Sequence, residues 1–333
     1  MAVAARHARG LRQPLARRRS LEETLQALRG VREQPESEAS SRELRRILES
    51  ESSHAVARAA ALLGEAGLAA LAPELVAAFP RFFAALPKSD PGCSAKTAIV
   101  EALRRLGRDE AAVYRRAARH VQMEPVFGGR VDTAVDLRSA AALALAEQGG
   151  RDVLALLAEL LADPEPPVRI AAARAVAVHG NGAGVPLLRL KVLSPEPEPR
   201  VVTECLLALL RLDESGELAF VASFLGKPDA LAEAGALALG ESRLPKAFEA
   251  LRDWLPAARQ RGLTRTALLA VASLRRDEAT AWLLALVRDE PPAVAREALA
   301  ALATLGPTVS ERALVAASAR AELQSAVEKL FKR

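Results

Sequence analysis

The side chains that most often carry nucleophilic or metal chemistry are sparse in this chain of 333 residues. They comprise four histidines and two cysteines: His7, His54, His120, His179, Cys93 and Cys205. A serine or cysteine nucleophile needs a base within hydrogen-bond reach, and a metal site needs several ligands that cluster. The histidines and cysteines are scattered without a telling spacing. We therefore predict no catalytic residue, no metal ligand and no cofactor, and we favour a protein that is not an enzyme, while enzymatic activity stays open.

The two cysteines also bear on the compartment. Cys93 and Cys205 lie in predicted helices, more than a hundred residues apart, which favours two buried apolar thiols over a disulfide. No apolar stretch reaches the length of a secretory signal or a membrane span without a charge or a helix breaker. The sequence therefore predicts a cytoplasmic protein without a membrane span.

The positive charge of the chain is concentrated at its start. The net charge is +5, but the first 20 residues hold six arginines and no acid, and the other 313 residues hold 40 bases and 41 acids. A helical array that grips phosphate along its groove needs a basic stripe over much of its length. Charge therefore disfavours nucleic acid as a partner of the body. Residues 1–19 are expected to form a basic, disordered arm, and nucleic-acid binding by this arm is our third functional hypothesis.

The elements that must position any site follow an internal repeat. The segment DPEPPVRIAAARAVAVHG at 163–180 has a near copy, DEPPAVAREALAALATLG, at 289–306. Each Ala/Leu-rich run has an anchor position near its start, and from Arg138 onward these anchors recur every 30 to 33 residues. The anchors are Arg58, Lys96, Arg138, Arg169, Val202, Ala232, Arg265 and Arg296. Such a period predicts helix pairs that stack into an all-α solenoid of about seven or eight pairs.

An acid stands six residues before the anchor in five of the eight copies, at Asp90, Asp132, Asp163, Glu196 and Glu290. This spacing spans the turn before a helix and its first turn, so each group can bond the backbone or the opposite charge of a neighbouring repeat. We expect these charges to form a structural ladder that fixes the stacking register. The predicted members are Asp90, Lys96, Asp132, Arg138, Asp163, Arg169, Glu290 and Arg296.

The repeat organises the chain into four parts. Residues 20–40 are expected to form a short helix, with a capping box from Ser20 to Glu23 and a stop at Gly30, followed by a polar linker. Residues 41–310 form the predicted solenoid, and residues 311–333 form C-terminal capping helices. No segment alternates apolar and polar residues for long enough to predict a strand.

The motif at 163–180 has a turn acid, prolines, Val-Arg, a helix of small residues and a closing glycine, and it resembles the second helix of a HEAT repeat. The short spacing is similar to that of the phycobilisome-lyase-type HEAT-like repeats, and the resemblance covers residues 50–310. It implies an α-solenoid, and most members of the family are binding scaffolds. Fold alone does not fix function.

The enzymatic members supply alternatives. Iron-dependent hydroxylases of this kind carry His-Glu pairs, and none of the four histidines here is followed by Glu. HEAT-like DNA glycosylases use aromatic side chains and an acid, for which Trp254, Trp282 and Asp253 are candidates; the neutral body and the tryptophan spacing favour packing positions instead. A chromophore-lyase-like or other modifying activity on a protein partner remains our second hypothesis.

Two features indicate a binding surface. The step from Lys96 to Arg138 is about ten residues longer than the regular repeat, and the surplus falls near QMEPVFGGRVD at 122–132. Insertions in solenoids form loops on one face, often the binding face, and an arginine cluster lies beside this one. The predicted partner-binding residues are Arg104, Arg108, Arg115, Arg116, Arg119, Phe127 and Arg130.

These observations favour a non-catalytic scaffold or adaptor. Its predicted partner is another protein with an acidic surface or a helical segment, and the sequence leaves the oligomeric state open.

Overall fold

The computed structural model describes residues 21–84 and 87–331. The predictions for the arm at 1–19 and for a cap at Ser20 lie outside the described residues. Contacts within the chain divide it into two compact units, Met1–Arg108 and Asp109–Arg333. We describe each unit by itself.

Unit 1 is a stack of short helices joined by 3-10 turns. Its central helix α3 packs against α1, α2 and α5. Ser37 and Ser52 cap α2 and α3, because each side chain accepts a hydrogen bond from a backbone N–H of the first turn. The expected stop at Gly30 is wrong, since the first helix continues past it to Glu33. The helices are α1 (Leu21–Glu33), α2 (Glu38–Leu48), α3 (Ser53–Glu65), α4 (Ala72–Ala78) and α5 (Ser94–Arg105).

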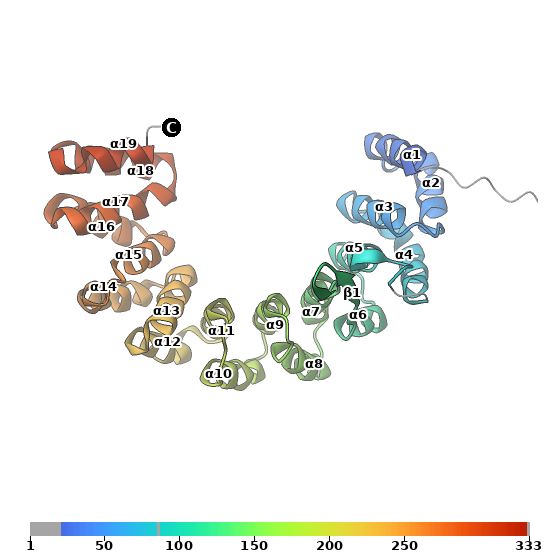
Figure 1. Ribbon diagram of the computed structural model, residues 1–333, viewed down its shortest axis with the longest axis horizontal. Coiled ribbons are helices and arrows are strands. Elements are labelled where there is room, and N and C mark those ends of the chain that lie inside the picture. Colours follow the sequence, from blue (N-terminus) through green and yellow to red (C-terminus); the bar gives the residue numbers. More distant parts are fainter. Residues whose placement is uncertain (1–20, 85–86, 332–333) are drawn as a thin grey trace, which may run out of the picture. The chain divides into compact units, whose positions relative to one another are not determined.

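Unit 2 is an α-solenoid of stacked helix pairs. Its second helices, α7, α9, α11, α13, α15 and α17, pack against one another in sequence order. Figure 1 shows them on one side of the row, with α8, α10, α12, α14 and α16 on the other. The all-α solenoid fold is therefore confirmed. The helices are α6 (Ala111–Ala118), α7 (Val135–Gln148), α8 (Arg151–Leu161), α9 (Pro166–His179), α10 (Val185–Leu193), α11 (Pro199–Leu212), α12 (Glu214–Ala222), α13 (Asp229–Ser242), α14 (Pro245–Gln260), α15 (Thr264–Ser273), α16 (Asp277–Asp289), α17 (Pro292–Leu302), α18 (Pro307–Ser318) and α19 (Gln324–Phe331).

The core consists of many thin layers of alanine and leucine. Small side chains let neighbouring second helices approach closely, and glycine is needed at the tightest contacts. A Cβ atom added to Gly240 on α13 would lie 2.3 Å from the carbonyl oxygen of Ala270 on α15. In unit 1, a Cβ added to Gly64 on α3 would lie 2.9 Å from the Cα of Ala102 on α5. Backbone contact of this kind sets the spacing between layers.

The surplus segment before α7 is a β-hairpin, although no strand was expected from the sequence. Strands β1 (Met123–Val126) and β2 (Gly129–Asp132) pair antiparallel, with Met123 opposite Asp132 and Val126 opposite Gly129. Each strand has four residues, which is too short for alternation to stand out in a sequence rich in single apolar residues. The loop is two residues long, and Gly128 adopts a φ of 87° that favours glycine.

None of the helices in the described ranges combines the length and the apolar character needed to cross a bilayer.

Gly240→Ala should destabilise unit 2, because the new methyl group collides with the α15 backbone. We expect a loss of about 1–3 kcal/mol from overpacking, even though alanine is the better helix former. Gly30→Ala is the matched control, since nothing lies within 4 Å of its Cβ position inside α1. That change should stabilise by roughly 0.5–1 kcal/mol. Urea unfolding measures the free energy of unfolding of both variants, which should fall for Gly240→Ala and rise for Gly30→Ala. An equal change in the two variants would contradict the close approach of α13 and α15.

Candidate functional site

Arg138 is a buried charged side chain of unit 2 that makes four hydrogen bonds. It projects from α7 with its side chain 2% exposed. Its Nη1 atom lies 2.7 Å from Asp132 Oδ2, and its Nε atom lies 2.8 Å from Asp163 Oδ2. Nη1 also donates to the carbonyl oxygen of His120 at 2.9 Å. One guanidinium group therefore joins the segment before the hairpin, the end of the hairpin and the turn of the next repeat.

The next anchor repeats this arrangement. Arg169 on α9 donates to Glu196 through Nε at 2.9 Å and Nη2 at 2.6 Å, and to the backbone carbonyls of Asp163 and Pro164. Lys191 adds a second cation, with Nζ 2.7 Å from Glu196. The side chain of Glu196 is only 2% exposed. An anchor of one repeat thus holds the turn acid of the following repeat.

The other predicted ladder residues behave differently. In unit 1, Asp90 and Lys96 are fully buried, with Lys96 Nζ 3.1 Å from Asp90 Oδ2 and 3.2 Å from the carbonyl oxygen of Phe82. This pair stays within its own repeat. Glu290 and Arg296 are not brought together, because Glu290 accepts from Arg259 Nη1 at 3.1 Å and Arg296 is exposed.

Hydrogen bonds outweigh desolvation at the ladder acids. Burial alone would raise the pKa of Asp132, but bonds from the backbone amides of Ala134 and Gln122 and from Arg138 lower it below its ordinary value. Burial likewise opposes the charge on Glu196, yet bonds from Arg169 and Lys191 lower its pKa to about 2. Burial disfavours the Arg138 cation, and its two aspartate partners still raise its pKa. Asp132, Arg138 and Glu196 therefore stay ionised at neutral pH.

The ladder closes the base of the hairpin. Asp132 Oδ1 accepts the backbone N–H groups of Gln122 at 3.1 Å and Ala134 at 2.9 Å. The pairing continues one step below the strands, where the N–H of Thr133 donates to the carbonyl of Gln122. Glu124 accepts from the side chains of both Gln122 and Thr133 at 2.7 Å. The hairpin therefore has a rigid polar base.

The rest of the hairpin is open to solvent and, apart from Arg130, exposes mainly apolar side chains and glycine. Phe127 at the turn is fully exposed, and four neighbouring side chains are between 39% and 55% exposed. Val126 and Val131 lie on one face of the two-stranded sheet, and Met123 and Arg130 lie on the other. Arg130 folds back to donate to the carbonyl of Met123 at 2.9 Å. We call Val121, Met123, Val126, Phe127 and Val131 the apolar hairpin surface.

The predicted arginine cluster is not a free basic surface. Arg115 pairs with Asp152, and Arg119 makes two bonds to Glu159 at 3.0 and 3.1 Å, so both arginines link α6 to α8. Arg116 is exposed on α6. The two remaining residues belong to unit 1, where Arg104 is half-buried on α5 and Arg108 is exposed after it. The hairpin is thus the part of the predicted site that most openly faces solvent.

Sequence reasoning missed a second set of arginines, which cap helix ends. Arg81 donates to the carbonyls of Leu48 and Glu49 at the end of α2. Arg320 donates to those of Val287 at 2.8 Å and Glu290 at 2.7 Å, at the end of α16. Arg261 does the same for Leu225 and Lys227 after α12. Carbonyls at a helix C-terminus lack intrahelical partners and favour cations. The sequence signal for these three arginines is a basic residue about one repeat after the carbonyls that it caps.

The aromatic and histidine candidates pack within the repeats. Trp282 meets Phe248 edge-on at 5.8 Å between ring centroids, and Trp254 is buried on α14. His179 Nε2 lies 3.0 Å from the carbonyl oxygen of Gly150, and His120 Nε2 lies 3.3 Å from Gln122 Oε1. Within residues 21–84 and 87–331, no three His, Cys, Asp or Glu side chains are grouped so that they could hold a metal ion.

Comparison with known protein families gives a match for the central part of the chain. Residues 130–190 match the sequence profile of HEAT repeats. This segment consists of HEAT repeats. It runs from β2 to α10 and contains Asp132, Arg138, Asp163 and Arg169, so the central part of the ladder lies inside the matched segment. No curated protein matches the chain.

Several solved structures are similar to the chain at low identity. Human deoxyhypusine hydroxylase is 18% identical, covers 80% of this chain and 97% of its own, and has a TM-score of 0.32. The complex of CpcE and CpcF of phycocyanin lyase from Nostoc is 19% identical, with coverages of 78% and 94% and a TM-score of 0.38. An engineered protein is 18% identical, with coverages of 92% and 90% and a TM-score of 0.35.

Arg138→Met should strongly destabilise the repeats around α7. Removing one partner of a buried ion pair typically costs about 3–5 kcal/mol, because Asp132 and Asp163 are left buried without their cation. Arg296→Met is the matched control, and an exposed change of this kind should stay within about 0.5 kcal/mol. Hydrogen exchange resolves the effect, with protection lost in α7 and at the hairpin base. Unchanged exchange there in the Arg138 variant would contradict the role of this residue.

The ion pairs of Glu196 with Arg169 and Lys191 should make the free energy of unfolding depend on pH in the acidic range. Because the folded pKa of Glu196 is about 2 and its ordinary value is 4.5, its contribution is present above pH 4.5 and is lost as the pH falls toward 2. The linked free energy is at most about 3 kcal/mol. Unfolding of the wild type and of Glu196→Gln should therefore differ at pH 7 and converge toward pH 2.5. A difference that stays constant with pH would count against this pair.

Proposed function

We propose that this protein is a non-catalytic scaffold that binds another protein through its hairpin. The observation that carries the proposal is the fully exposed Phe127 at the turn of a hairpin inserted into a HEAT-repeat array. Fully burying a phenylalanine side chain is worth roughly 1.5–3 kcal/mol. A partner that covers Phe127 would recover this free energy.

The neighbours of Phe127 extend the same surface. Val126 and Val131 share a face of the sheet, and both are about half exposed. Contiguous exposed apolar residues on a folded protein commonly mark an interaction site. Aromatic anchors supply much of the affinity at such sites. Val126, Phe127 and Val131 have this composition.

The base of the hairpin supports the proposal in a second way. Arg138, Asp132 and Gln122 fix both ends of the hairpin to α7, so the exposed turn is carried on a held stem. A surface ordered before binding loses less conformational entropy when a partner docks. The ladder residues are therefore proposed to position the hairpin and not to contact the partner.

We also propose a cytoplasmic location. Cys93 and Cys205 are both buried, and Cys205 is a free thiol, as expected in a reducing compartment. Burial raises the pKa of the Cys205 thiol to about 12, which keeps it protonated and unreactive.

A photo-crosslinking amino acid at position 127 of the full chain tests the proposal in the cells that express it. We expect it to capture one or a few proteins that a crosslinker at position 190 does not capture. Leu190 is the matched control, because it is a large apolar residue, 67% exposed, on α10.

The affinity of the isolated pair gives the second readout. Phe127→Ala should weaken binding of the captured protein by about tenfold or more, in keeping with the loss of an aromatic anchor. Leu190→Ala should leave it unchanged. Identical capture at positions 127 and 190 would overturn the proposal.

A further inference from the structure

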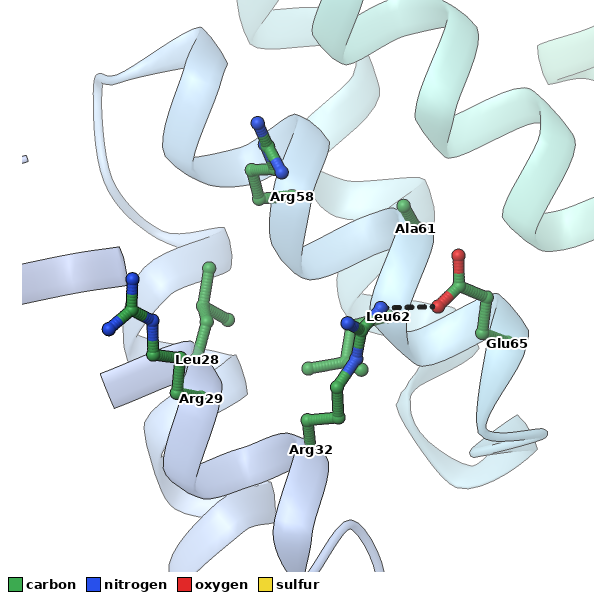
Figure 2. Close-up of a pocket in the computed structure, with 7 residues that line it drawn as sticks. All are labelled: Leu28, Arg29, Arg32, Arg58, Ala61, Leu62 and Glu65. Carbon is green, nitrogen blue, oxygen red and sulfur yellow. Dashed lines mark hydrogen bonds and ion pairs between the residues drawn. The ribbon is translucent and has the colours of Figure 1, made fainter. Parts of the chain in front are cut away.

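Unit 1 contains a cleft of about 400 Å³ between α1 and α3. Figure 2 shows its lining, which combines three arginines with one acid and an apolar floor. The lining residues are Leu28, Arg29, Arg32, Arg58, Ala61, Leu62 and Glu65. The cleft lies within one unit and apart from the hairpin surface in the chain.

Arg58, like Arg265, is a basic anchor whose repeat lacks the ladder acid. Ser52 stands six residues before it, where Asp90 and Asp132 precede Lys96 and Arg138. Lys96 and Arg138 are buried and paired, whereas Arg58 is exposed and makes no ion pair or side-chain hydrogen bond with any of the described residues. The position that elsewhere builds the ladder therefore supplies a cation to the cleft.

Arg29 adds a second uncompensated cation from the opposite helix. It is exposed on α1, and within the described part of the chain its guanidinium also lacks a bonded acid. Arg32 is paired, with Nη2 3.2 Å from Glu65 Oε2. The cleft thus presents three positive groups and one negative group. This charge balance favours an anionic ligand.

The placement of the guanidinium groups narrows the ligand class. In Figure 2, Arg29 and Arg58 extend from two different helices and lie apart, and the Arg32–Glu65 pair closes another side. The guanidinium groups of Arg29 and Arg58 do not converge on one point. Groups that bind a single phosphate would converge. Leu28, Ala61 and Leu62 form an apolar floor between them. Separated negative charges that flank an apolar side chain match this arrangement.

We propose that this cleft binds an acidic peptide segment, with carboxylates on Arg29 and Arg58 and an apolar side chain on Leu28 and Leu62. Arginine pairs well with carboxylates because its planar fork matches their two oxygens. The inference names the chemistry of a partner segment, and so it rests on the proposed protein-binding role. Both arginines are exposed, so binding is expected to be weak and to fall with added salt.

Arginine-selective NMR of the full chain tests the cleft without depending on the hairpin. The probe is a blocked Glu-Glu-Leu-Glu-Glu peptide, and the Nε–Hε signals of Arg29 and Arg58 are assigned from Arg29→Gln and Arg58→Gln. We expect these two signals to shift in a saturable way. The exposed Arg211 and Arg265 act as internal controls, and their signals should hardly move. Equal shifts at all four arginines would mean nonspecific attraction and would overturn the proposal.

Two further measurements separate the alternatives. Affinity for the acidic peptide should fall at least fivefold in the Arg29→Gln, Arg58→Gln double variant. It should change less than twofold in Arg211→Gln, Arg265→Gln, which removes the same charge. A neutral peptide carrying one phosphoserine should shift the Arg29 and Arg58 signals less than the acidic peptide; larger shifts would overturn the acidic-peptide assignment. The Arg29 and Arg58 signals are measured without the hairpin partner, so failure of the cleft can be told apart from failure of crosslinking at position 127.

Discussion

The buried guanidinium of Arg138 is the constraint on which the centre of the solenoid depends. A charge with 2% exposure is tolerated only when its donors are satisfied, and here two aspartates and a carbonyl satisfy them. Those acceptors come from the hairpin base and from the next repeat. A shift of either element would strand a buried charge. One side chain therefore couples the stacking register to the orientation of the hairpin.

Repeats without a charged anchor fix their spacing by packing. Val202 and Ala232 occupy the anchor places of α11 and α13, and both are buried. Gly240 then brings α13 into backbone contact with α15. Buried ion pairs thus fix the stacking register where repeats carry acids and bases. Close packing fixes it where small apolar residues take the anchor places. Stacked helix pairs accommodate both because each layer contacts only its neighbours.

The period of the sequence predicted the helix pairs and placed every anchor on a second helix, because one local pattern recurs in each repeat. It could not predict which charges pair. Arg115 and Arg119 were taken for an open basic surface, but their partners Asp152 and Glu159 lie 37 and 40 residues away. The surplus at 122–132 was predicted as a loop and not as strands, because each strand has only four residues. Arg58 matched the anchor pattern, yet it is exposed, and Ser52 stands where the ladder acid would be.

The capping arginines give the array a direction. The end of α2 is completed by Arg81, the 3-10 turn after α12 by Arg261, and the end of α16 by Arg320, each from a later part of the chain. Arg138 and Arg169 likewise pair with acids that lie 25 and 27 residues later in the chain. During synthesis from the N-terminus, a newly made repeat therefore lacks its final partners until its successor emerges. Folding of the chain should trail its synthesis by about one repeat, with the last formed layer always the least complete.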